Sequence, residues 1–151
     1  MKQYRPQFAD EFEQMIGPTL TEIGKGGCFR EVFHIEGTRA VIKFPMQDET
    51  GNYSVIHSRR EIRRIKQVMR SKKYKHIQRY VPKMYYSDYK NGILIMQFLH
   101  DVGDAPEDAQ DIIGKMLEDT FCCISKDSDV NKINMGYDGR GQIKVLDWGC
   151  V

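Results

Sequence analysis

The chain has 151 residues, 40% of them hydrophobic and 29% charged, with a formal net charge of +2, which suits one packed domain and excludes a disordered chain. No apolar run approaches the roughly 20 residues that cross a bilayer, and the N-terminus lacks the apolar stretch of a secretory signal, so we expect neither. The four cysteines form no C-x-x-C pair, which argues against a structural zinc site or a disulfide framework and favours a reducing, cytoplasmic location.

The first part of the chain is predicted to form antiparallel strands. A short amphipathic lead-in ends at Pro18, and β-like patterning begins at Thr19. A glycine cluster separates the first strand from a second that ends at Ile35. The turn Glu36-Gly37 leads into a third strand over 38–44, which is rich in β-branched and apolar residues.

A helix and two more strands complete the first hundred residues. The helix is expected over about 54–71, with Glu61 at the margin of its apolar stripe. That stripe consists of Ile62, Ile65, Val68 and Met69. Strands over 81–87 and 92–98 follow, and Asn91-Gly92 supplies the turn of their hairpin. The sequence therefore predicts a five-stranded sheet with one helix inserted after the third strand.

The remainder of the chain is predicted to be shorter and mixed. A helix is expected over 106–124, followed by an Asp- and Asn-rich segment over 127–134. A turn at Asp138-Gly139 precedes a last strand over 142–146. Residues 99–105 are a candidate hinge between two small lobes.

Charge is strongly segregated along the chain. Between Arg59 and Arg79 lie ten lysines or arginines and one acid, Glu61, whereas seven acids and one base lie between Asp101 and Asp119. The basic segment indicates a polyanion or an acidic partner. The alternative is that these side chains only solvate an exposed face.

Three features of the first lobe have the chemistry of a phosphate site. Gly24, Gly26 and Gly27 lie between two strands, where backbone N–H groups can wrap around phosphate oxygens, or where they form an ordinary turn. Lys43 lies in an apolar strand, so it either extends out to solvent or holds an anion. Glu61 either pairs with a neighbouring arginine on the helix surface or faces the sheet and pairs with Lys43.

Three oxygen-bearing side chains follow in the second lobe. Asp129 and Asn134 are separated by four residues, and Asp147 comes thirteen residues after Asn134, in the sequence Asp147-Trp148-Gly149. A carboxylate can accept a proton from a nucleophilic hydroxyl, and Asp and Asn oxygens are ligands that Mg²⁺ takes beside phosphates. The alternative is an Asx-rich loop that caps a turn.

Taken in chain order, these residues resemble the protein-kinase-like fold over nearly the whole chain. The glycine cluster is similar to the phosphate loop, Lys43 to the Val-Ala-Ile-Lys lysine and Glu61 to the glutamate of helix C. Asp129 and Asn134 match the catalytic-loop pattern D-x-x-x-x-N, and Asp147-Trp148-Gly149 resembles Asp-Phe-Gly with tryptophan in place of phenylalanine.

The resemblance implies a single α+β domain with two lobes. The N-terminal lobe, about 1–100, would hold a five-stranded antiparallel sheet and helix C. A minimal C-terminal lobe, about 101–151, would hold helix E, the catalytic loop and short strands. ATP would bind between the lobes, with Met96 as gatekeeper and Phe98 in the hinge, and the lysine would contact its α/β-phosphates. Asn134 and the Asp-Phe-Gly-type aspartate would bind Mg²⁺, and the catalytic-loop aspartate would align the acceptor hydroxyl.

Departures from the family pattern shape the functional expectation. Asp127-Ser128 replace the usual His-Arg, and Asn131 stands where protein kinases carry a lysine. The chain as given ends two residues after Gly149, so we expect no activation segment and no standard peptide-docking half. The pattern is closer to small bacterial and phage kinase-like proteins.

The sequence thus predicts a miniature serine/threonine-type kinase that transfers the γ-phosphoryl group of ATP to a hydroxyl acceptor, on a protein. The main alternative is a non-catalytic kinase-like module that binds and regulates or inhibits a protein partner. A homodimer or a partner that completes the site is compatible with both. The third hypothesis is polyanion or nucleic-acid binding through 59–79, for which interleaved aromatic residues are scarce.

Overall fold

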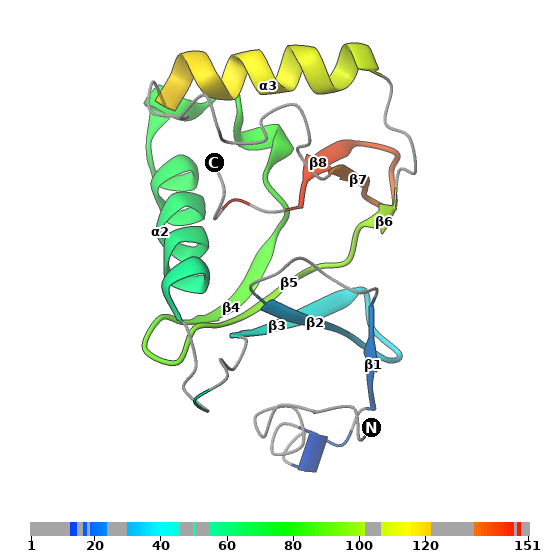
Figure 1. Cartoon of the computed structure of the whole chain (residues 1–151). Helices are drawn as coiled ribbons and strands as arrows, with labels where there is room; N and C mark the ends of the chain where they lie inside the picture. Colours follow the sequence, from blue (N-terminus) through cyan, green and yellow to red (C-terminus); the bar gives the residue numbers. More distant parts are fainter. Residues whose placement is uncertain are drawn as a thin grey trace. The chain divides into compact units, whose positions relative to one another are not determined.

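The computed structural model describes residues 13–14, 17, 19–23, 30–45, 50, 55–101, 107–121, 135–146 and 148. Within these residues the fold is α+β, with a five-stranded sheet, a three-stranded sheet and the helices α2 and α3 (Figure 1). None of the described helices is long and apolar enough to cross a membrane. The predicted lead-in before Pro18 lies almost wholly outside the described residues.

The predicted five-stranded antiparallel sheet is confirmed. Its strands are β1 (Leu20–Glu22), β2 (Arg30–Ile35), β3 (Ala40–Pro45), β4 (Met84–Asp88) and β5 (Ile93–Gln97). The spatial order is β1-β2-β3-β5-β4, and every neighbouring pair is antiparallel. Alternating apolar side chains from β1, β2 and β3 form a buried cluster, in which the Phe33 and Phe44 rings meet edge to face at 5.8 Å.

The predicted turns of this sheet are also confirmed. Gly37, between β2 and β3, and Gly92, between β4 and β5, have φ angles of 77° and 69°, which glycine adopts without a Cβ clash. The Asp88 carboxylate accepts hydrogen bonds from the side-chain amide of Asn91 at 2.8 Å and its backbone N–H at 3.1 Å. The side-chain bond from Asn91 is the main cause that lowers the pKa of Asp88.

Helix α2 (Ile56–Arg70) forms where the sequence predicts it, but two of its residues differ from the prediction in their exposure to solvent. Glu61 is fully buried, whereas it was predicted to lie at the margin of the apolar stripe. Met69, predicted to belong to the apolar stripe, is 51% exposed because it lies in the last turn, where no described residue covers it. Two short 3₁₀ helices, η1 (Lys72–Tyr74) and η2 (Gln78–Tyr80), follow α2 and were not predicted.

The second half of the chain contains helix α3 (Glu107–Phe121) and a small antiparallel sheet of order β6-β7-β8. The strands are β6 (His100–Asp101), β7 (Met135–Tyr137) and β8 (Ile143–Val145). The predicted last helix and last strand are confirmed, and Ile113 and Leu117 of the helix are buried. At the predicted turn, the Asp138 carboxylate accepts hydrogen bonds from the N–H groups of Gln142 and Arg140, which lower its pKa.

A lysine ties β8 to the 3₁₀ segment that follows α2. Lys144 Nζ donates to the carbonyl oxygens of Arg79 and Val81, each at 3.2 Å. Partial burial, with a smaller contribution from the nearby Lys83, lowers the pKa of the Lys144 amine. These two bonds join parts of the chain more than sixty residues apart.

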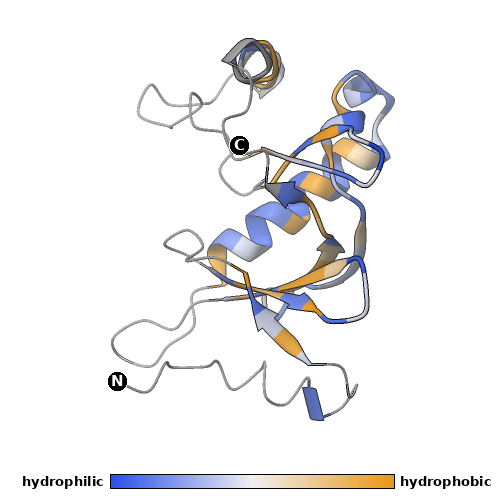
Figure 2. Cartoon of the chain, turned by 90° about the vertical axis from the view of Figure 1, so that its right-hand side faces the viewer, coloured by the Kyte–Doolittle hydropathy of each residue, from blue (hydrophilic) through white to orange (hydrophobic). Residues whose placement is uncertain are grey.

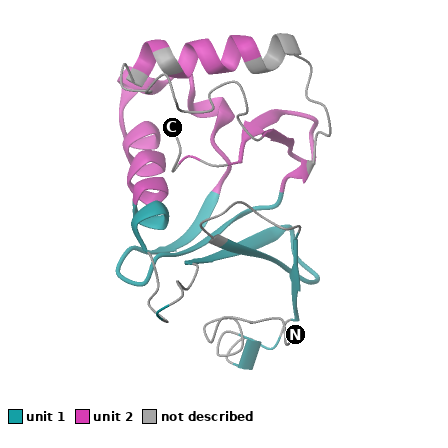
Figure 3. Ribbon diagram, viewed as in Figure 1, with its two compact units in different colours: residues 1–59, 84–98 teal, residues 60–83, 99–151 magenta. Residues whose placement is uncertain are grey.

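Contacts divide the chain into two compact units (Figure 3). Unit 1 comprises residues 1–59 and 84–98, and unit 2 comprises residues 60–83 and 99–151. The five-stranded sheet belongs to unit 1, and α3 with the β6-β7-β8 sheet belongs to unit 2. The sequence groups 60–83 with the first hundred residues, whereas their contacts group them with unit 2.

Candidate functional site

Lys43 is held in the interior of the larger sheet. It lies on β3 between β2 and β5, opposite Val32 on one side and Leu94 on the other, and its side chain is only 7% exposed. It therefore does not extend into solvent, which was one of the two expected alternatives. Removing an ammonium from water is costly unless an anion or hydrogen-bond acceptors compensate it, so this position is suited to hold negative charge.

Glu61 is the second buried charge. It is 0% exposed on α2, one residue before Ile62, which is 1% exposed. This burial is incompatible with the alternative of a solvent-exposed ion pair on the helix surface. Among the described residues, Lys43 and Glu61 are the buried side chains that carry a charged group, and both are residues that the sequence singled out.

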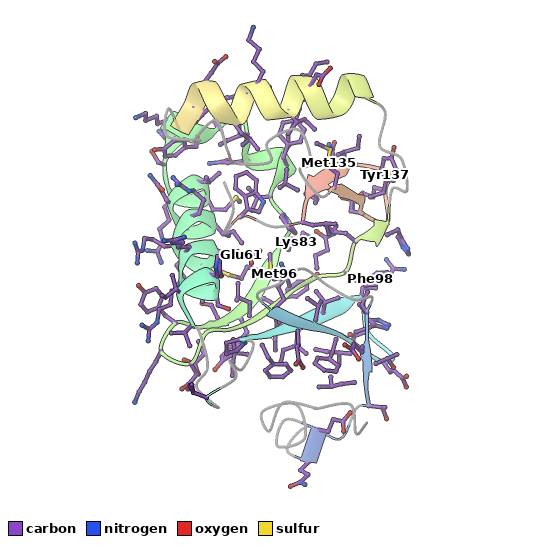
Figure 4. All side chains as sticks on the ribbon, in the orientation of Figure 1. Glu61, Lys83, Met96, Phe98, Met135 and Tyr137 are labelled. Carbon is purple, nitrogen blue, oxygen red and sulfur yellow. The ribbon has the colours of Figure 1, made fainter. Side chains whose placement is uncertain are left out.

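Met96 lies near the end of β5, and Phe98 directly follows the last residue of that strand (Figure 4). Met96 is 1% exposed and pairs with Val41 on β3 and with Met84 on β4. Phe98 is half-buried, its N–H donates to the carbonyl of Arg39 at 2.8 Å, and its ring lies 5.0 Å from the His34 ring. Unit 1 therefore fixes the backbone at Phe98 by its own contacts, directly where the chain leaves the sheet.

The remaining predicted site residues lie outside the described part of the chain: Gly24, Gly26, Gly27, Asp129, Asn134 and Asp147. The elements that flank them are described. The backbone N–H of Ile23 donates to Val32 O at 2.9 Å, so β1 and β2 pair directly on either side of the glycine cluster. Trp148 is fully buried, and its indole N–H has no hydrogen-bond partner among the described residues.

The described residues contain no group of three or more His, Cys, Asp or Glu side chains arranged to hold a metal ion. Asn134 and Asp147, the predicted Mg²⁺ ligands, lie outside the described residues. The magnesium site thus stays a prediction.

One feature of unit 2 was not predicted. A hollow of about 610 Å³ lies between one face of α3 and the segment that contains η1. Its α3 residues are Ile112, Lys115, Met116, Asp119 and Thr120, and Lys73 and His76 complete it. The helical spacing of the α3 residues is visible in the sequence, but it resembles that of any solvated helix face, so no motif drew attention to it.

Comparison with known proteins leaves the family of this chain open. No protein-family model matches it, and no curated protein is similar enough in sequence to be a relative.

Proposed function

We propose that the chain is a small ATP- and Mg²⁺-dependent phosphotransferase with a protein-kinase-like fold, acting on a hydroxyl group of a protein. The observation that carries the proposal is the burial of Lys43 on the third strand and of Glu61 on the helix that follows it. These are the two positions at which the kinase-like pattern requires a lysine and a glutamate. Buried charges are costly, so chains retain them where they have a task.

Each site residue has a defined role in this proposal. Lys43 binds the α/β-phosphates and Glu61 orients it, while Asn134 and Asp147 hold Mg²⁺. Asp129 takes the proton of the acceptor hydroxyl as that oxygen bonds to the γ-phosphorus and the bond from phosphorus to the β,γ-bridging oxygen breaks, releasing ADP. ATP supplies the phosphoryl group, and the protein contributes position and charge.

Nucleotide binding is the first test, measured as thermal unfolding with and without Mg²⁺-ATP. At a hundred times its dissociation constant, a ligand stabilises the folded state by about 2.7 kcal/mol, which is roughly 5–10 °C for a domain of this length. We expect Lys43→Met, which keeps the volume of the buried side chain, to lose this shift. Lys144→Met is the matched control, because it also removes a partly buried strand lysine, and it should keep the shift even if its own melting temperature is lower.

Phosphoryl transfer is tested separately with γ-labelled ATP and the Asp129→Asn variant. We expect this variant to keep the Mg²⁺-ATP shift and to lose transfer of label, because it keeps the shape of the side chain but not the proton acceptor. Binding without any transfer in the wild type would instead favour the non-catalytic regulatory module. The absence of a shift at millimolar ATP would contradict both nucleotide-dependent functions.

A further inference from the structure

We propose that the hollow of unit 2 between α3 and η1 is a docking site for an acidic amphipathic helix of a partner protein. The site is built on one face of α3, where Ile112, Lys115, Met116 and Asp119 follow one another at helical spacing. The lining runs from Ile112 to Thr120, about 12 Å along the helix axis at 1.5 Å per residue. An elongated face of this kind suits a second helix laid along it better than a compact small molecule.

One hydrogen bond already joins the two sides of the hollow. His76 Nε2 and Thr120 Oγ1 are 3.0 Å apart, and the Thr120 hydroxyl donates to the carbonyl of Met116 at 2.7 Å. The threonine oxygen is therefore the acceptor for the histidine. Because these contacts lie within unit 2, the hollow does not need a partner to form it, and binding would cost little reorganisation.

The hollow offers apolar surface that the fold leaves exposed. Ile112 is 61% exposed, and in the described part of unit 2 the only other large apolar side chain classed as exposed is Met69, which does not line the hollow. Met116 lies beside Ile112 and is half-buried. Two adjacent apolar side chains one helical turn apart are the type of surface into which the apolar face of a helix packs.

The charge around this surface selects an acidic occupant. Lys73 and Lys115 line the hollow against one acid, Asp119, and Lys72 and Lys75 are exposed on either side of Lys73 in sequence. The whole segment from Arg59 to Arg79 holds ten basic residues and one acid, which is buried. Figure 2 shows α2 mainly in the hydrophilic colours. Helix α3 itself carries five acids and one base, so an acidic partner would be attracted from the η1 side of the hollow and then fixed at the apolar centre.

Nucleic acid fits the same charge less well. The aromatic residues of the described segment 60–83 are Tyr74 and Tyr80, and both are buried, with Lys73 over the first ring and Arg79 over the second. Neither ring is available to stack on a base. A phosphate backbone would also leave Ile112 and Met116 without an apolar partner. The observations therefore favour a protein helix, and nucleic acid becomes an outcome of the test.

The docking site does not depend on the proposed phosphoryl transfer, and its test contains no nucleotide. The probe is a capped synthetic peptide of about 18 residues, long enough to be helical, with leucines at i, i+3, i+4 and i+7 and glutamates on both sides of that stripe. A shuffled peptide of the same composition and a DNA duplex of about 20 base pairs are the comparison ligands. Each is titrated into the ¹⁵N-labelled full chain and followed by amide chemical shifts.

We expect the helical peptide to shift amides within 112–120 and 73–76, and the shuffled peptide to bind at least about tenfold more weakly. Lys73→Glu/Lys115→Glu and, separately, Ile112→Ser should each weaken binding about tenfold, from charge repulsion and from lost apolar burial respectively. The matched controls are Arg60→Glu/Arg140→Glu and Met69→Ser, which change exposed residues of unit 2 outside the hollow. They should change the dissociation constant by no more than about twofold.

Three results would overturn the proposal. The first is the absence of amide shifts at millimolar peptide. The second is an equal loss of affinity in the hollow variants and their controls, which would indicate general charge attraction. The third is tighter binding of the duplex than of the peptide at about 0.15 M salt, which would assign the basic surface to nucleic acid. Because the substituted side chains are largely exposed, retained dispersion of the amide spectrum separates each result from unfolding.

Discussion

Two glycines in unit 1 have the same backbone conformation and very different surroundings. Gly37 and Gly92 have φ angles of 77° and 69°. A Cβ on Gly37 would meet no atom within 4 Å, whereas one on Gly92 would lie 3.1 Å from Val55 Cβ and 3.2 Å from Ser58 Cβ. The β4–β5 turn is thus packed against the start of α2, and the β2–β3 turn is open.

Alanine at the two positions should separate backbone strain from packing. We expect Gly37→Ala to lower the free energy of unfolding by about 1–2 kcal/mol, the cost of a left-handed conformation. Gly92→Ala should add about 1–3 kcal/mol to this cost, because Val55 and Ser58 must move. Urea unfolding followed by circular dichroism measures both. Equal losses at the two positions would mean that the turn does not pack closely on the helix.

At the scale of elements, the short strand β8 and the short helix η2 are connected through one side chain, Lys144. β8 has three residues and η2 has three, too few to be stable by their own hydrogen bonds. The two Lys144 bonds to the carbonyls of Arg79 and Val81 supply the connection. A hydrogen bond from a charged donor is stronger than one from a neutral donor.

Replacing that lysine should loosen the connection. We expect Lys144→Met to destabilise unit 2 by about 1–3 kcal/mol, because two carbonyls lose a charged donor while the aliphatic part of the side chain is kept. Lys75→Met, at an exposed position, should change stability by less than about 0.5 kcal/mol. Trp148, the single and fully buried tryptophan, reports unit 2 unfolding by fluorescence in urea. An unchanged free energy of unfolding in Lys144→Met would show that other contacts hold β8 in place.

Periodicity and turn residues were enough to predict the two helices and most strands of the fold, but not β6, β7 or the 3₁₀ helices. The five strands of the larger sheet, α2, α3 and β8 all follow an apolar pattern bounded by turn residues. β6 lies in the segment that the sequence marked as a hinge, and β7 directly follows the Asp- and Asn-rich segment, so neither was recognised as a strand; β7 pairs with β6 on one side and with β8 on the other. The 3₁₀ helices lie in a lysine-rich stretch whose order depends on the burial of Tyr74 and Tyr80.

The sequence was enough to predict which residues of the candidate site carry charge, but not how deeply each one is buried. The sequence identified Lys43 as a possible phosphate ligand and Glu61 as its possible ion-pair partner, but it placed Glu61 at the edge of the apolar stripe and left open whether Lys43 reached solvent. A helical projection gives the direction of a side chain, not what covers it, and burial is decided by residues distant in sequence. The same limit explains why Met69 was expected in the core and why the hollow beside Ile112 was missed.

For the whole molecule, the dominant electrostatic feature is the separation of charge along the chain. A net charge of +2 conceals ten basic residues between Arg59 and Arg79 and seven acids between Asp101 and Asp119. On α2, like charges recur at i, i+3 and i+4, as in Arg60 with Arg63 and Arg64. Such pairs repel one another by a few tenths of a kcal/mol each, so the helix is less stable at low salt than its apolar face alone would make it.

Added salt should therefore stabilise the protein at low ionic strength. Raising sodium chloride from about 0.01 M to about 0.1 M shortens the Debye length from about 30 Å to about 10 Å. We expect a gain of roughly 1 kcal/mol, or about 2–4 °C in melting temperature, from screening of the α2 pairs. Arg60→Gln/Lys66→Gln removes four of those pairs, so this variant should melt higher at low salt and respond less to added salt. A melting temperature that falls as salt is added would mean that attraction between the basic and acidic segments outweighs repulsion within the basic one.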